Sequence, residues 1–441
     1  MRGAVLLAGV ALGACSAPAR PQPTAAPAGP PAACRTLAAG GDLRALAAVP
    51  GARLCLAAGR YAGPIAIAAG AVVWGPREAV LERPAGGTVV ELGADAALLG
   101  VTVDGRGGVF DRTDAGVRVT GDGARVEGVA VVNAVFGILA ERVSRATIRG
   151  NRVDGGRAPA ISLRGDTIRL WEVADSVIDG NEVDGGRDVV VWYSSGNRVT
   201  GNRITGGRYG THLMYSHANH IAHNRYDGDV VGVFVMYSHD VALDGNLVRE
   251  AGGAAGMGIG LKDSGNITLT HNALVHDHVG LYLDQAPLQI AHTLTVEDNL
   301  FARCDTAVQF HASGHRSRVA RNDFLDDAFT VRVEGGGDAS DVAWDGNYFD
   351  DYAGYDLDGD ELGDVPYQLR SLEDDLTAQT PALAFFRGTP ALEAADAVTR
   401  LVPMYERRTL LTDRAPRMSP HDWTHDWPND RPNDREDHDA H

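Results

Sequence analysis

The chain has 441 residues, 44% of them hydrophobic, and a formal net charge of -18 at pH 7. Its only lysine is Lys262, so the composition excludes a basic nucleic-acid-binding surface, and we expect no nucleic acid partner. The 54 glycines and an aromatic content of 6% are typical of short strands separated by tight turns, which favours an all-β fold.

The N-terminus is predicted to direct the protein to the cell envelope. Residues 1–14 resemble a lipoprotein signal peptide, because their apolar stretch is much too short to span a bilayer. They end in the lipobox-like sequence Leu12-Gly13-Ala14-Cys15, so we expect Cys15 to carry a lipid that anchors the protein to a membrane. The alternative is an ordinary cleaved signal with an incidental cysteine. The Pro- and Ala-rich residues 15–33 are predicted to be an extended tether.

The remaining cysteines divide into a pair and a single residue. Cys34 and Cys55 are close in sequence, and an oxidising compartment favours a disulfide between them. Cys304 is left over. Its ordinary interpretation is a small buried hydrophobe, and the alternative is a metal ligand.

Residues 34–347 contain a repeated unit of a glycine, two short alternating strands and an asparagine. Helical solenoids need longer repeats, so the unit predicts one coil of a right-handed parallel β-helix whose stacked coils share a core. In the unit at 232–239, alternation places Val233 and Val235 inside and Phe234 and Met236 outside. Equivalent asparagines are expected to stack as a structural amide ladder. They are Asn181, Asn202, Asn224, Asn246, Asn272, Asn299, Asn322 and Asn347.

Residues 348–412 are predicted to form an acidic turn followed by a helical segment. The carboxylates at alternating positions resemble the start of a calcium loop. The EF-hand glycine and glutamate are replaced by Glu361 and Tyr367, so a calcium site of another geometry and a solvated acidic turn both stay open. The candidate calcium ligands are Asp356, Asp358, Asp360 and Asp364.

The helical segment and the C-terminal residues each have their own sequence pattern. Between Thr380 and Val402 the apolar spacing is helix-like, with Pro390 placed to start a short C-terminal helix. Residues 413–441 are acidic and contain histidines, and we predict a disordered, solvated tail.

Aligning the coils puts side chains with metal-binding chemistry in one outward column. The phrase Met-Tyr-Ser-His occurs at 214–217 and again at 236–239, one coil apart. Thioether and imidazole groups suit copper, especially Cu(I), better than hard cations. A docking patch is the alternative, because exposed Met and Tyr are common at interfaces. The candidate copper ligands are Met214, Met236, His212, His217 and His239.

The same column continues into Lys262, Asp284 and His311, with Asp263 adjacent. A cation, a carboxylate and a histidine along a β-helix groove are groups that could abstract a sugar C5 proton or hydrolyse a glycosidic bond. A polysaccharide-active enzyme (a lyase, epimerase or glycosidase) at the cell envelope is therefore the alternative function. A surface ion pair is the structural interpretation of the same residues.

Taken together, these motifs resemble the NosD family over roughly residues 35–412. The repeats alone do not distinguish this family from other β-helix proteins, and the resemblance depends on the order of several short sequence motifs. These are the paired Met-Tyr-Ser-His phrases, Gly280-Leu281-Tyr282-Leu283, Val308-Gln309-Phe310-His311, Asp345-Gly346-Asn347-Tyr348-Phe349, the turn at 356–360 and Asp364-Val365-Pro366-Tyr367.

The resemblance implies a function in the periplasm. NosD-like proteins act with an ABC transporter membrane subunit, a copper chaperone and apo-nitrous oxide reductase, whose copper centres they help to assemble. The resemblance therefore implies a non-enzymatic maturation factor for that reductase or a related copper enzyme. It implies no ligand set, so the candidate copper ligands rest on the column alone.

Overall fold

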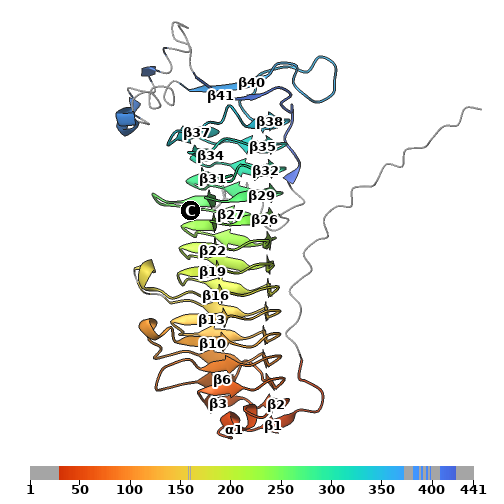
Figure 1. The fold of residues 1–441 in the computed structure, drawn as a ribbon, viewed down its shortest axis with the longest axis vertical. Coiled ribbons are helices and arrows are strands. Elements are labelled where there is room, and N and C mark those ends of the chain that lie inside the picture. Colours follow the sequence, from red (N-terminus) through yellow and green to blue (C-terminus); the bar gives the residue numbers. More distant parts are fainter. Residues whose placement is uncertain are drawn as a thin grey trace, which may run out of the picture.

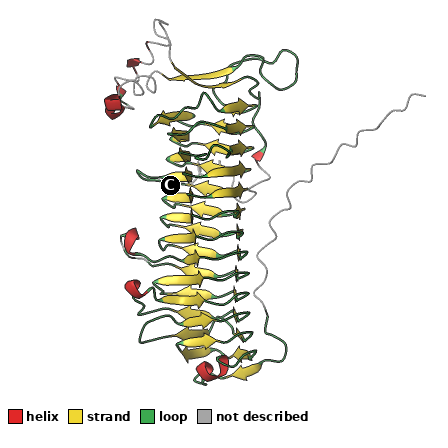
Figure 2. Ribbon diagram, viewed as in Figure 1, coloured by secondary structure: helices red, strands yellow, loops and turns green. Residues whose placement is uncertain are grey.

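Parallel β-sheets wind around one elongated core in the computed structural model of the chain (Figure 1). The structure describes residues 29–156, 158, 160–371, 381–386, 389–390, 394–395, 398 and 408–423. Within these residues, sheet A has 16 strands, sheet B has 13 and sheet C has 12. Between the ends of the solenoid, each coil contributes one strand to each sheet, and nearly all elements are strands (Figure 2). The prediction of an all-β parallel β-helix is confirmed.

The strands are short, and the three sheets contain the following elements in chain order. Sheet A contains β1 (Arg35–Leu37), β2 (Arg53–Leu56), β5 (Val72–Trp74), β8 (Ala97–Leu99), β11 (Arg125–Glu127), β14 (Thr147–Arg149), β17 (Val177–Asp179), β20 (Arg198–Thr200), β23 (His220–Ala222), β26 (His239–Asp244), β29 (Gly265–Thr270), β32 (Leu294–Glu297), β35 (Ser317–Ala320), β38 (Ala343–Asp345), β40 (Tyr367–Ser371) and β41 (Arg408–Asp413). Sheet B contains β3 (Gly59–Ala62), β6 (Ala79–Glu82), β9 (Thr102–Asp104), β12 (Ala130–Val132), β15 (Arg152–Asp154), β18 (Glu182–Asp184), β21 (Arg203–Thr205), β24 (Arg225–Asp227), β27 (Leu247–Arg249), β30 (Ala273–Val275), β33 (Leu300–Ala302), β36 (Asp323–Leu325) and β39 (Tyr348–Phe349). Sheet C contains β4 (Ile65–Ile67), β7 (Val90–Leu92), β10 (Ala115–Val119), β13 (Phe136–Glu141), β16 (Ile168–Trp171), β19 (Asp188–Trp192), β22 (Tyr209–Met214), β25 (Val231–Met236), β28 (Met257–Lys262), β31 (Val279–Asp284), β34 (Thr306–His311) and β37 (Val331–Glu334).

The helices are few and short. They are α1 (Leu43–Ala47), which lies at the N-terminal end of the solenoid, and the 3-10 helices η1 (Phe110–Arg112), η2 (Ile161–Leu163) and η3 (Pro381–Phe386). No helix among the described residues is long and apolar enough to cross a bilayer.

The inward positions follow the predicted alternation. In β25, Val233 and Val235 have no exposed area, while Phe234 and Met236 point outward. Inward side chains from all three sheets pack into one continuous apolar cluster along the solenoid. Alternation with period two is what places one side chain of each pair in this core.

An asparagine ladder connects the coils at the turn that leads into sheet B. Asn181 donates from Nδ2 to Asn202 Oδ1 at 2.8 Å and to the Ile148 carbonyl at 3.0 Å. The same pattern repeats down the solenoid, and the amides are almost fully buried. The ladder comprises the eight predicted asparagines and Asn151.

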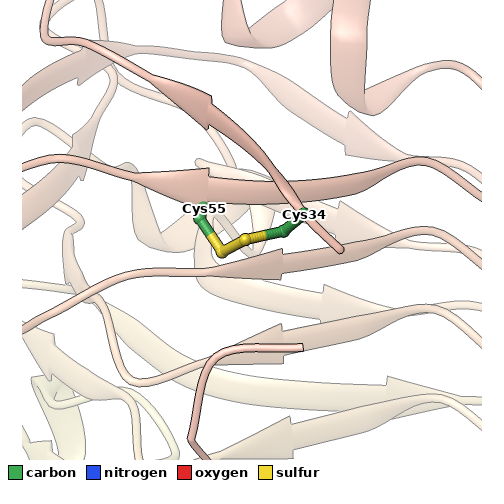
Figure 3. Close-up of a disulfide and its surroundings, with 2 residues drawn as sticks. All are labelled: Cys34 and Cys55. Atoms are coloured by element: carbon green, nitrogen blue, oxygen red, sulfur yellow. A yellow bond between two sulfur atoms is a disulfide. The ribbon is translucent and has the colours of Figure 1, made fainter. Parts of the chain in front are cut away.

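Both ends of the solenoid are closed by specific contacts. At the N-terminal end, Cys34 and Cys55 form a disulfide with their Cα atoms 5.6 Å apart (Figure 3). At the C-terminal end, Asp413 at the end of β41 accepts hydrogen bonds from Asn347 Nδ2 at 2.8 Å and Asn347 N at 2.9 Å. Its carboxylate takes the place that the next asparagine carbonyl would occupy and therefore terminates the ladder.

The predicted C-terminal helix between Thr380 and Val402 is not supported. The described helical positions in that interval are η3 and the scattered residues 390, 394–395 and 398, and most of residues 390–402 lie outside the described part of the chain. Phe385 and Phe386 are 87% and 49% exposed. Short helices depend on packing of an apolar face, which these side chains do not provide here.

The prediction of a disordered tail is wrong for residues 413–423. Asp323, at the start of β36, is fully buried and binds Arg417, His421 N at 2.7 Å and Trp423 Nε1 at 2.6 Å. A buried carboxylate needs such partners, and the acidic composition of the tail did not indicate that the tail supplies them. Residues 1–28, including Cys15, and residues 424–441 lie outside the described residues.

The ladder predicts a large effect for the substitution Asn246→Ala. Asn246 Oδ1 accepts from both N and Nδ2 of Asn224 at 3.0 Å, and the substitution leaves these buried donors unsatisfied. We expect a loss of about 3 kcal/mol in the free energy of unfolding, measured by urea denaturation. Thr268→Ala, on the exposed face of β29, is the control and is expected to change stability by less than about 0.5 kcal/mol. Equal effects would contradict a stabilising role of the ladder.

The contact between Asp323 and the C-terminal segment predicts a pH dependence. Burial by itself raises the pKa of the Asp323 carboxyl, but His421, Arg417 and Trp423 outweigh burial and hold the pKa below its usual value. A depressed carboxyl pKa stabilises the folded state above the unfolded-state pKa of about 3.9, and this stability is lost as the pH falls through the folded-state pKa. We expect the indole N–H resonance of Trp423 to report release of the segment in that acid range. In Asp323→Asn the segment should already be loosened at neutral pH, and an unchanged acid transition in this variant would rule out Asp323 as its cause.

Candidate functional site

Sheet C carries the outward column that the sequence predicts. Strands β19, β22, β25, β28, β31 and β34 pair in parallel, and the register places equivalent residues side by side. The predicted alignment of the coils is therefore confirmed. The column runs through Trp192, Met214, Met236, Lys262, Asp284 and His311.

The two methionines lie next to each other at the ends of their strands. Met214 ends β22 and Met236 ends β25, and they are register partners. Neighbouring strands are about 4.8 Å apart, so both thioethers project from adjacent positions on a rigid sheet. Both residues are partly exposed.

His212 lies on the same face but is buried. Its ring is 5% exposed and is covered by the rings of Trp192, Tyr209 and Phe234, with centroids 5.4, 4.8 and 6.3 Å away. Nε2 lies 3.3 Å from Met236 Sδ, and Trp192 Nε1 donates to Nδ1 at 3.3 Å. Burial lowers the pKa of His212 to about 4, so the imidazole is neutral at neutral pH.

The predicted residues His217 and His239 form a separate group on the turn between sheets C and A. Their rings are stacked with centroids 3.8 Å apart, and the backbone N–H of His239 donates to His217 Nδ1 at 3.2 Å. His239 Nδ1 lies 2.7 Å from Asp240 Oδ2. Burial, and then the charge of His239, lower the pKa of His217. The structure therefore divides the five predicted copper ligands into a methionine group with His212 and a histidine pair.

His292, which no sequence motif indicates, joins the histidine pair. Its ring centroid is 5.6 Å from that of His239. Gly265, the register partner of His239, has no side chain, and a Cβ there would approach His292 Nδ1 to 2.5 Å. His292 lies in an insertion between β31 and β32 and so occupies no repeat position. Sequence periodicity could not assign it to this column.

A stack of tyrosines borders the methionines. Tyr193, Tyr215 and Tyr237 follow the column residues in successive coils, and their rings stack with centroids 5.4 and 4.9 Å apart. All three have φ near +50°, in the left-handed region that turns the chain out of sheet C. Tyr193 and Tyr215 are 46% and 44% exposed. The stack presents ring edges to solvent next to the methionines, as a docking surface would.

Lys262, Asp263 and Asp284, which the sequence suggested for a polysaccharide-active enzyme, form an ion cluster with one another. Lys262 Nζ lies 2.5 Å from Asp284 Oδ2 and 3.4 Å from Asp263 Oδ2. The hydrogen bond that Lys262 donates to Asp284 is the main cause of the raised pKa of Lys262. His311 is the register partner of Asp284, and its ring stacks near Tyr282. A lysine held protonated by two carboxylates is a poor general base, so this geometry favours the ion-pair interpretation.

The acidic turn brings together three of its four predicted calcium ligands. Asp356, Asp358 and Asp360 offer carboxylate oxygens that lie within 4.8 Å of one another. Asp364 instead accepts a hydrogen bond from Leu357 N at 2.7 Å. Both Asp356 oxygens accept backbone N–H groups, from Gly359 at 2.7 Å and Glu361 at 3.0 Å. These bonds account for the turn, and a calcium ion here stays a prediction.

Cys304 lies inside the solenoid. It is 2% exposed, and burial raises the pKa of its thiol well above the usual value, with Asp277 and Asp327 adding to the effect. A buried thiol of this kind is protonated and is not a surface metal ligand.

Comparison with known proteins places these coils in a family. Residues 145–354, which contain the whole outward column from Trp192 to His311, match the family model described as periplasmic copper-binding protein (NosD). The chain is 29% identical over 113 residues to the probable ABC transporter binding protein NosD of Pseudomonas aeruginosa. It is 28% identical over 111 residues to the protein with the same name from Stutzerimonas stutzeri. Each alignment covers 25% of this chain and 26% of the relative, so the match spans about a quarter of the length of these relatives.

Among solved structures, the chain is similar to the catalytic unit of a GH87 α-1,3-glucanase from Streptomyces thermodiastaticus. The TM-score is 0.51 at 15% identity, and the alignment covers 74% of this chain and 65% of the other. At this identity the likeness concerns the fold alone. The family model and the relatives' shared name agree with the order of motifs along the chain, and residues 145–354 are similar to the NosD family.

Proposed function

We propose that this protein is a copper-handling accessory factor of the periplasm that helps to assemble the copper centres of nitrous oxide reductase or a related envelope enzyme. The observation that carries the proposal is the pair Met214 and Met236, which are register partners on adjacent strands and are both partly exposed. The family whose model matches residues 145–354 is described as periplasmic and copper-binding.

The chemistry of this pair favours monovalent copper. Thioethers are soft, neutral ligands that suit Cu(I) better than hard cations. Two thioethers on a fixed sheet would bind the ion without a change of backbone, and their partial exposure would allow the ion to leave. Such a site fits a protein that passes copper on rather than one that stores it.

The histidine pair on the neighbouring turn, which forms a group separate from the methionines, is a second candidate site for copper. The carboxylate of Asp240 faces His239 Nδ1, so Nδ1 carries the proton and Nε2 keeps its lone pair. His217 accepts a backbone N–H at Nδ1, so its proton lies on Nε2 and it offers no lone pair outward. Of the two predicted residues, His239 is therefore the better candidate ligand.

The surroundings of the methionines suit protein partners. The exposed tyrosine stack and the methionines form a surface of the composition common at protein interfaces. The curated relatives are named ABC transporter binding proteins. We propose that an ABC transporter membrane subunit, a copper chaperone and the apo-reductase contact this protein, which a lipid on Cys15 would hold at the membrane.

A Cu(I) competition titration of the full chain tests the proposal. The wild-type protein is expected to bind Cu(I), and the Met214→Ala/Met236→Ala variant to bind at least about tenfold more weakly, because each ligand contributes more than about 1 kcal/mol. Met257→Ala, in β28 but outside the column, is the matched control and should bind as the wild type does. Absence of binding by the wild type, or equal loss in the control, would refute the ligand assignment.

A further inference from the structure

The hydrogen bonds around His212 fix the position of its proton. The indole N–H of Trp192 can only donate, and it points at His212 Nδ1 at 3.3 Å. Nδ1 must therefore hold a lone pair, and the proton of the neutral ring lies on Nε2. Nε2 in turn lies 3.3 Å from Met236 Sδ, so the ring donates an N–H to the thioether.

This arrangement prevents the imidazole from acting as a ligand through the nitrogen that faces the methionines. Coordination through Nε2 would require its proton to move to Nδ1, where it would face the Trp192 N–H. Two N–H groups at this distance repel each other, and both side chains are held in place by surrounding rings. The lone pair on Nδ1 is covered by the indole and is unavailable to a metal.

We propose that His212 is a positioning residue that withholds its own lone pair and orients Met236, so that the copper site presents thioethers and accepts Cu(I) or Ag(I) but rejects Cu(II) and Zn(II). The inference rests on the proposed copper function, which it extends to the class of ion. Cu(II) and Zn(II) bind readily to imidazole, and a site without an available imidazole offers them little.

The neighbours of His212 in its column argue that packing alone does not explain a histidine there. The register partners on either side are Val190 and Phe234, both apolar and buried. An apolar side chain would fill the position in the same way. The imidazole adds an N–H for the thioether and an acceptor for Trp192, and these two bonds define its contribution.

The inference is tested by removing the donor that fixes the proton. Trp192→Phe keeps an aromatic ring but frees Nδ1 to carry the proton, so Nε2 can coordinate. We expect the full-length variant to bind Cu(II) at least about tenfold more tightly than the wild type, with a nitrogen-ligand signal in its EPR spectrum. Its Cu(I) and Ag(I) affinities should change only a few-fold.

Two further variants make this result specific. Trp171→Phe is the matched control, because the Trp171 indole N–H donates to Glu172 at 3.1 Å and not to His212, while phenylalanine keeps an aromatic ring packed against Trp192. It should gain no Cu(II) affinity. Adding His212→Leu to Trp192→Phe should abolish the gain, which separates it from Cu(II) bound by histidines elsewhere. No gain in Trp192→Phe, or an equal gain in the control, overturns the inference.

X-ray absorption of the Cu(I)-loaded wild type distinguishes failure of this inference from failure of the proposed function. We expect sulfur scatterers that are retained in His212→Leu. An imidazole contribution that disappears in His212→Leu would make His212 a ligand and overturn the inference while leaving copper handling intact. Absence of any Cu(I) binding by the wild type would overturn both.

Discussion

The buried asparagine ladder is the constraint on which the rest of the structure depends. Each amide donates to the next amide and to a backbone carbonyl, so a coil shifted by one residue would leave several buried polar groups unsatisfied. The register of every coil is therefore fixed at one turn, and the strands that follow inherit it. Asp413 closes the last rung with a carboxylate, which couples the end of the chain to the same register.

Because the register is fixed, residues at equivalent positions of the sequence repeat become neighbours in space. Because Met214 and Met236 occupy the same position relative to their ladder residues Asn202 and Asn224, they must lie on adjacent strands. The same rule stacks three tyrosines in the left-handed region, where each ring covers the next and offsets the strain of a non-glycine residue at positive φ. The face of sheet C is thus assembled by repetition, without loops that need to move.

The fold and this column could be predicted because both depend on periodicity, which the sequence displays directly. What could not be predicted depends on side-chain orientation or on inserted chain. His212 and His217 are close in sequence, but His212 lies buried under aromatic rings, whereas His217 lies beyond the end of the strand and stacks on His239. His292 lies in an insertion that is not part of the repeat, so periodicity does not place it beside His239. The partners of Asp323 come from about a hundred residues downstream, where composition alone indicated a solvated tail.

If the methionine face binds copper as proposed, the same rigidity would decide which ions it accepts. A proton fixed on His212 discriminates between ions only if Trp192 cannot rotate away when a metal approaches. Trp192 is held by the edge of the Trp171 ring, 5.9 Å away, and by the guanidinium of Arg169 at 5.9 Å, both from the preceding coil. Arg169 also lies 4.9 Å from the Trp171 ring. Residues that never touch the metal would therefore maintain the selectivity, because the ladder holds their coil in register with the methionines.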